Sequence, residues 1–161
     1  MTRQAGFTLL ELLIGLAIAG LIAGFLGTFV YETMRVTNSG NDHLLVTDDL
    51  RSAAAWLSQD GQMADFATSM AATSSLVLSW TDAYSGANIG YRATYSVAGT
   101  ELQRSYGVRG GTQVTTTVAR HIASAQDVRF ALGNGMLTAT ITSTAGTVSE
   151  GQQIQVGLRS R

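Results

Sequence analysis

The most apolar part of the chain lies at its N-terminal end. Phe7 to Tyr31 is an almost uninterrupted apolar run that contains one charged residue, Glu11. A helix of this length, rising about 1.5 Å per residue, is long enough to cross a hydrocarbon core of roughly 30 Å. The short polar leader before the run carries Arg3, and a positive flank of this kind stays in the cytoplasm. The pattern predicts one membrane-crossing helix over residues 7–31, with residues 32–161 exported.

Two ordinary explanations compete for this run. A secretory signal peptide has an apolar stretch of roughly 7–15 residues and a small-residue cleavage site behind it. Here the run is longer, and the bulky, charged segment 31–35 follows it. A plain membrane anchor fits the length but gives no reason for Glu11, because an ionisable residue in such a segment is costly. An anchor tolerates a carboxylate near the interface, so Glu11 alone does not decide.

A second helical pattern follows a polar cluster. Asn38-Ser39-Gly40-Asn41 contains helix breakers that either end the first helix or bend it. Apolar and small residues then recur at spacings of three and four, at Val46, Leu50, Ala53, Leu57, Gly61 and Ala64. This stripe predicts an amphipathic helix over residues 44–66 that continues the membrane helix as one long spine. Trp56 lies near the stripe and is expected to pack against a later sheet.

From residue 74 the pattern changes to that of strands. Alternation and composition predict strands at 75–80, 91–97, 101–106, 113–118, 128–132, 137–142 and 154–158. Turn signals stand at Ala98-Gly99 and Gly133-Asn134-Gly135. One long helix followed by several hairpins predicts an α+β fold, in which an antiparallel β-sheet packs on the helix.

Composition narrows the possible functions. The chain has 161 residues, 45% of them hydrophobic, which suits one globular domain with an appendage. All 10 basic residues are arginines scattered along the chain, which argues against a nucleic-acid partner. Cysteine is absent, which excludes disulfides and thiolate metal sites. Proline is absent too, which removes the usual cause of a helix kink.

The order of residues at the start of the chain is the most specific signal. The segment from Arg3 to Leu13, RQAGFTLLELL, resembles the class III signal of type IV prepilins and type II secretion pseudopilins. The resemblance implies that prepilin peptidase, a membrane aspartyl peptidase, removes residues 1–6 by cutting after Gly6. It also implies that Phe7 becomes the N-methylated first residue of the mature chain.

Glu11 then stands at the fifth mature position, where the family carries an acid. Cutting after Gly6 leaves an amine on Phe7 about one helical turn from this carboxylate, and opposite charges attract strongly at low dielectric. The resemblance implies that Glu11 instead meets the amine of a neighbouring subunit during assembly. Such a contact fixes axial register, because any other stagger leaves a buried charge unpaired, which costs about 3–5 kcal/mol.

The apolar run is rich in small residues. Gly20 and Gly24 form a GxxxG pair, beside Ala19 and Ala23 at the same spacing. Such pairs let helices approach closely, although glycine is also simply common in membrane helices. In the family, pilin helices melt locally in the filament near a proline, and here the stretch 20–27 is expected to supply that weakness.

The tail resembles the family more loosely. The segments DDLR (48–51), LSQD (57–60) and LQR (102–104) are similar to those of J-type minor pseudopilins, and the C-terminal disulfide loop of many major pilins is missing. The resemblance implies a structural protein and no enzyme: a minor subunit of a type II secretion pseudopilus or a type IV pilus. Its partners would be other pilin-like subunits, prepilin peptidase, the assembly platform and the bacterial inner membrane. Its body would be periplasmic or extracellular.

Other readings stay open at this point. A tip adhesin or a DNA-uptake (competence) pilin would present an aromatic or basic patch on the sheet, and an anchored enzyme would need a polar cluster in a pocket. His43 and His121, the chain's 2 histidines, have no second ligand at helix spacing and predict no metal site. No cofactor is expected; a calcium loop at Asp82, Ser85 and Asn88 is the weaker alternative to a solvated turn. A further possibility is a basic group formed by Arg104, Arg109 and Arg120.

Overall fold

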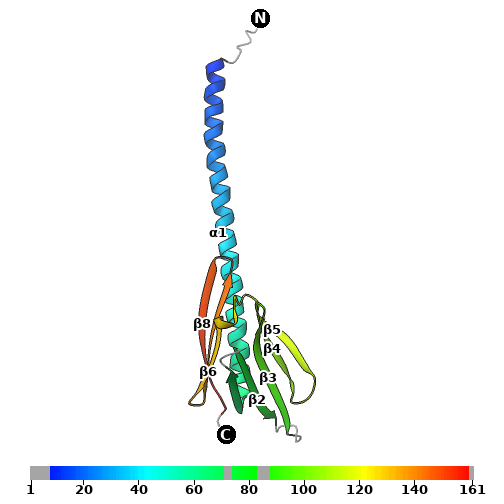
Figure 1. Ribbon diagram of the computed structural model, residues 1–161. Coiled ribbons are helices and arrows are strands. Elements are labelled where there is room, and N and C mark those ends of the chain that lie inside the picture. The colour runs from blue at the N-terminus through cyan, green and yellow to red at the C-terminus, as the bar shows by residue number, and fades with distance from the viewer. Residues whose placement is uncertain (1–7, 71–73, 83–87, 160–161) are drawn as a thin grey trace. The chain divides into compact units, whose positions relative to one another are not determined.

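The computed structural model describes residues 8–70, 74–82 and 88–159, and these residues form two compact units. The units divide between Gly40 and Asn41. In the first unit, the described residues from Leu9 onward are all helical. The second contains a helical segment and all the strands, and it is an α+β unit as the sequence predicted (Figure 1).

Helix α1 runs from Leu9 to Met63, and the polar cluster Asn38–Asn41 lies within it. The cluster therefore does not end the helix, because residues with poor propensity cost only about 0.5–1 kcal/mol each when helix continues on both sides. Threonine hydroxyls along α1 donate hydrogen bonds to backbone carbonyls of the preceding turn. Thr37, for example, donates to the carbonyl of Thr33 at 2.9 Å. Such bonds satisfy a polar side chain without leaving the helical backbone.

The predicted helix end at residue 66 is wrong by three residues. α1 ends at Met63, and Phe66 is the first residue of strand β1, Phe66–Met70. The backbone N–H of Asp65 donates to the carbonyl of Ser79 at 3.0 Å, so the chain joins the sheet directly after the helix. The helical stripe continues in spacing through this segment, but pairing with β2 outweighs that local pattern.

The strands form two antiparallel sheets rather than the single sheet predicted. The five-stranded sheet has the order β1-β2-β3-β4-β5, and the three-stranded sheet has the order β6-β7-β8. The remaining bounds are β2 Ser75–Asp82, β3 Ile89–Ala98, β4 Glu101–Val108, β5 Gln113–Ala119, β6 Val128–Gly133, β7 Met136–Ala145 and β8 Val148–Gly157, with a 3-10 turn η2 at Ala125–Asp127. Each strand pairs with its neighbour in sequence, so both sheets are simple meanders.

The amphipathic stripe of residues 46–64 forms the centre of the core, as predicted. Its members Val46, Leu50, Ala53, Leu57, Gly61 and Ala64 are all buried. They pack against alternate residues of the strands, such as Leu76 and Leu78 of β2 and Ile141 of β7. Trp56 packs at the margin of this core, which confirms its expected place.

Two glycines in this unit have clear steric reasons. Gly61 lies where α1 approaches β8, since a Cβ built there would stand 2.7 Å from Cγ1 of Val156. Gly135 has a φ of 73°, next to Asn134 with a φ of 52°. Two successive positive φ values define the tight turn between β6 and β7, and Asn-Gly is the favoured pair for it.

Candidate processing and assembly site

The first described residues form a capping box at the start of α1. The backbone N–H of Thr8 donates to Oε2 of Glu11 at 3.0 Å, and the Thr8 hydroxyl donates to the same oxygen at 2.9 Å. In return, the N–H of Glu11 donates to Oγ1 of Thr8 at 3.3 Å. This reciprocal arrangement satisfies donors that a helix start leaves without partners.

The capping box gives Glu11 a local partner that the sequence analysis missed. The signal was present, because Thr8 and Glu11 have the Thr-x-x-Glu spacing of such a box. Both Thr8 donors end on Oε2, and a carboxylate accepts about four hydrogen bonds. Glu11 therefore keeps capacity for a further donor. The predicted cleavage site, Gly6, and the predicted methylated residue, Phe7, lie outside the described residues.

The described part of the first unit exposes its apolar side chains. Every described side chain from Thr8 to Gly40 is exposed, including Phe25 and Phe29 at more than two thirds of their full area. α1 is long and apolar enough in this part to cross a membrane. Exposed apolar surface of this extent marks a segment that contacts lipid or other helices.

The glycines of the first unit leave open space around the helix. A Cβ added at Gly15, Gly20, Gly24 or Gly27 would meet nothing within 4 Å. No contact within the described chain therefore requires a glycine at these positions. This leaves the predicted helix-packing role of Gly20 and Gly24 as a prediction about other chains.

Residues 1–27 match the family model of the prokaryotic N-terminal methylation motif. This motif is the signal of type IV pilins and pseudopilins, so the chain carries a pilin-type signal, as its sequence order predicted. An apolar helix joined to this signal fits anchoring in an inner membrane. No curated protein and no solved structure matches the chain.

In the second unit, a buried carboxylate on α1 holds the segment between the two sheets. Asp49 is 7% exposed. It accepts the backbone N–H groups of Arg120 and His121 at 3.0 and 2.9 Å, and the Ser143 hydroxyl at 3.0 Å. Nδ1 of His121 lies 2.9 Å from the same carboxylate. Asp49 thus ties the helix to strand β7 and to the chain that leaves β5.

A second buried carboxylate, Asp60, pairs with Arg104 of β4. The guanidinium donates from Nε to Oδ2 at 2.6 Å and from Nη2 to Oδ1 at 2.7 Å, while the Tyr95 hydroxyl donates to Oδ2 at 2.5 Å. Burial raises the pKa of Tyr95 far above its ordinary value, and the charge of Asp60 adds to this. Burial alone lowers the pKa of Arg104, but its hydrogen bond to Asp60 and the charge of that carboxylate outweigh the effect and raise it.

Aromatic rings surround this ion pair. The Arg104 guanidinium carbon lies 4.5 Å from the ring centroids of both Trp56 and Tyr106. Tyr106 stacks in turn with Trp80 at 5.8 Å and with Tyr91 at 5.8 Å. Trp56 and Tyr106 therefore cover the Arg104 guanidinium, and Trp80 and Tyr91 stack on Tyr106, so the rings stabilise the packing around the ion pair.

In the sequence, Asp49 and Asp60 stood out only as parts of the segments 48–51 and 57–60, which resemble those of J-type minor pseudopilins. A helical count could have placed both on the stripe, because Asp60 stands seven residues after Ala53 and Asp49 three after Val46. A carboxylate inside an apolar stripe predicts a buried partner, since an unpaired buried charge is strongly unfavourable.

The remaining candidate residues do not come together. His43 pairs with Glu150 at 2.9 Å. Arg104 is engaged by Asp60, so it does not form the basic group considered with Arg109 and Arg120. Among the described residues, no three histidine, aspartate or glutamate side chains are placed to hold a metal ion. Of the calcium candidates, Asp82 ends β2 and Asn88 precedes β3, whereas Ser85 lies outside the described residues.

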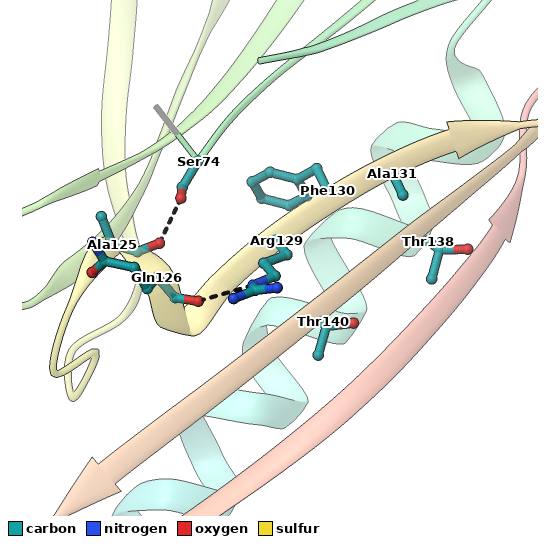
Figure 2. A pocket seen from close by; sticks show the side chains of 8 residues that line it. All are labelled: Ser74, Ala125, Gln126, Arg129, Phe130, Ala131, Thr138 and Thr140. Carbon is teal, nitrogen blue, oxygen red and sulfur yellow. Dashed lines mark hydrogen bonds between the residues drawn. The ribbon is translucent and has the colours of Figure 1, made fainter. Parts of the chain in front are cut away.

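A cavity of about 490 Å³ lies beside β6 and β7, and its lining side chains are drawn in Figure 2. Its lining residues are Ser74, Ala125, Gln126, Arg129, Phe130, Ala131, Thr138 and Thr140. The Arg129 guanidinium points toward Gln126 (Figure 2), and its Nε lies 3.4 Å from the Gln126 carbonyl. Arg129 is the single charged side chain in this lining, which holds no carboxylate or imidazole to form a proton-transfer pair with it.

Proposed function

We propose that the chain is a minor pilin-like structural subunit of a type II secretion pseudopilus or a type IV pilus. Prepilin peptidase cuts after Gly6 and the new N-terminus of Phe7 is methylated. The mature helix then leaves the inner membrane to pack against the helices of other pilin-like subunits. The leader is cytoplasmic, the chain crosses the membrane once, and the second unit lies in the periplasm or outside the cell.

The single observation that carries this proposal is the pilin-type signal over residues 1–27, joined to a helix with no buried side chain in its first unit. An apolar helix whose described side chains are all exposed needs lipid or other helices around it. Glu11 supports the assembly step, because its carboxylate keeps hydrogen-bonding capacity beyond the capping box.

The alternative of a tip adhesin or DNA-uptake pilin receives less support. The aromatic group that it requires is partly internal, since Trp80 is 8% exposed and Arg104 is 6% exposed, whereas Trp56, Tyr91 and Tyr106 are half-buried. These groups stack on each other and pair with Asp60. An enzymatic function is not part of the proposal.

The test is the composition of filaments sheared from cells that make a tagged version of this protein. We expect the protein to be present as a small fraction of the filament, together with a more abundant pilin-like subunit. The same cells carrying Glu11→Leu should retain the protein in the membrane and lose it from the filament fraction. Abundant filaments built from this chain alone would contradict the minor role, and its complete absence from filaments would contradict the structural role.

A further inference from the structure

Strand β5 leaves one edge of the five-stranded sheet open. It is the last strand in the sheet order, so among the described residues its far side pairs with no other strand (Figure 1). The first five residues of the strand, from Gln113 to Thr117, are all exposed or half-buried. A strand in this position presents a row of backbone N–H and C=O groups that can pair with another strand.

Natural proteins usually protect such an edge, but this one carries few of the usual devices. The segment from Gly110 to Ala119 contains no charged residue and no proline. By contrast, β8, one of the two outer strands of the other sheet, carries Glu150. The one protective feature of β5 is a β-bulge at its far end, where Leu102 pairs with Ala119 while Gln103 pairs with Thr117. The regular part of the edge is therefore Gln113–Thr117.

The face of the sheet beside this edge is open as well. Val114 lies opposite Tyr106 in the β4–β5 pair, yet its side chain is 66% exposed. Thr116, on the same face, is also exposed. A strand added to β5 would place alternate side chains next to these two, so apolar residues at those positions would cover Val114.

Charge selects between possible occupants. Exposed Arg109 and Arg120 stand at the two ends of the uncharged segment. Glu101 is close enough to Arg120 for their charges to interact, but the edge itself remains positive at its other end. A second copy of the chain would bring another arginine, its own Arg109, to this strand pair. A partner strand with a carboxylate at the end beside Arg109 would meet opposite charge instead.

We propose that the β5 edge, Gln113–Thr117, is a docking site for an extended strand of a partner protein. The partner strand alternates apolar and uncharged polar residues and carries a carboxylate at the end that lies beside Arg109. Backbone hydrogen bonds supply the affinity, and the apolar residues beside Val114 together with the end charge supply selectivity. The proposal does not rest on the filament role, because strand capture by β5 requires neither Glu11 nor a filament.

The probe is a labelled synthetic peptide of alternating valine and threonine with a glutamate at each end. Its binding to the full-length chain in detergent micelles is followed by fluorescence anisotropy, with empty micelles as the blank. We expect saturable binding. Methylation of alternate backbone nitrogens should weaken binding about tenfold or more in one register and little in the other, because only alternate N–H groups face β5. A peptide with lysines at its ends should bind more weakly than the glutamate peptide.

The matched protein variants are Thr115→Pro and Thr116→Pro. Consecutive N–H groups of a strand point to opposite sides, so one proline removes a bond to β4 and the other removes an outward donor. The variant whose melting temperature stays at the wild-type value should lose about tenfold in peptide affinity. If both proline variants unfold, the two N-methylated peptides still test whether the peptide pairs with β5 as a strand.

Three results would overturn the proposal. They are no peptide binding above the micelle blank, equal binding of both methylated registers, and equal binding of the glutamate and lysine peptides. Concentration-dependent dimerisation of the chain that is lost in the proline variants would assign the edge to a second copy, and would overturn the acidic partner. A failure of filament incorporation with intact peptide binding would count against the proposed function alone.

Discussion

Asp60 and Arg104 form a two-pronged ion pair, with N–O distances of 2.6 and 2.7 Å, between α1 and β4. Asp60 is fully buried and Arg104 is 6% exposed. The pair fixes the helix against the five-stranded sheet at one angular setting, because a rotation of α1 would leave two charges buried without partners.

Removing one partner of this pair should be strongly destabilising. We expect Asp60→Ala to lower the free energy of unfolding by about 3–5 kcal/mol, because Arg104 then remains buried and unpaired. Denaturant unfolding of the detergent-solubilised chain, followed by tryptophan fluorescence, measures this. Both tryptophans, Trp56 and Trp80, lie in the second unit. The control is Asp48→Ala, whose exposed carboxylate lies one residue before Asp49. Equal stability of the two variants would show that the ion pair does not hold the helix.

The Tyr95 hydroxyl should make the folded chain less stable at alkaline pH. Burial, reinforced by Asp60, raises the pKa of this phenol in the folded chain above the ordinary 10.0. In the unfolded chain the phenol loses its proton above pH 10.0, whereas in the folded chain it keeps it, so the unfolded state binds fewer protons. The protonated Tyr95 hydroxyl therefore stabilises the folded chain fully below pH 10.0, and this stabilisation is lost as pH rises above that value.

Tyr95→Phe removes the hydroxyl and with it the pH-dependent part of the stability. The variant should be less stable than wild type at pH 8, because Asp60 loses a hydrogen bond worth about 1–2 kcal/mol. The gap between the two unfolding midpoints should narrow as pH rises above 10.0. If the unfolding midpoints of wild type and Tyr95→Phe differ by the same amount at every pH in this range, the raised pKa of Tyr95 in the folded chain is contradicted.

Gly61 should be needed for the close approach of α1 to β8. We expect Gly61→Ala to cost about 1–3 kcal/mol, because the new methyl group would overlap Val156. In the double variant with Val156→Ala, the cost should be less than the sum of the two single costs. Gly40→Ala is the matched control: it lies in the same helix with open space around it, and should stabilise by about 0.5–1 kcal/mol. Additive costs in the double variant would remove the steric explanation.

The carboxylate of Glu11 can be separated from its capping role. Glu11→Leu and Glu11→Gln should still insert in the membrane but enter filaments poorly, because the register charge is gone. Thr8→Ala removes the capping hydroxyl, which costs about 1 kcal/mol, and leaves the carboxylate in place. It should enter filaments at a level close to Thr8→Ser. If Thr8→Ala fails as completely as Glu11→Leu, helix capping and not register explains the requirement for Glu11.

The spacing of apolar residues predicted the buried face of α1 correctly, because every stripe member from Val46 to Gly61 is buried in the same unit. It could not assign Asp49 and Asp60, since their partners Ser143 and Arg104 lie 94 and 44 residues away along the chain. Such long-range pairs leave no local trace in the sequence beyond a polar residue on an apolar stripe.

The division of the strands into two sheets could not be predicted from the alternation of apolar and polar residues either. Alternation states which residues of a strand face inward, but it does not state which strand lies beside it. Strand β1 was missed because Phe66–Met70 is only 5 residues long and follows a helical spacing without a turn signal. The hairpin turns were predictable, since Gly99 and Gly135 adopt the positive φ that their positions require.

The central claim is that this chain is processed and assembled as a pilin-like subunit. Its most direct test is the intact mass of the protein extracted from membranes of cells that have prepilin peptidase, measured beside cells that lack it. The account predicts a chain that begins at Phe7 and carries one added methyl group when the peptidase is present, and the full chain from Met1 when it is absent. A chain that still begins at Met1 with the peptidase present, or one that begins beyond Tyr31, would contradict the account.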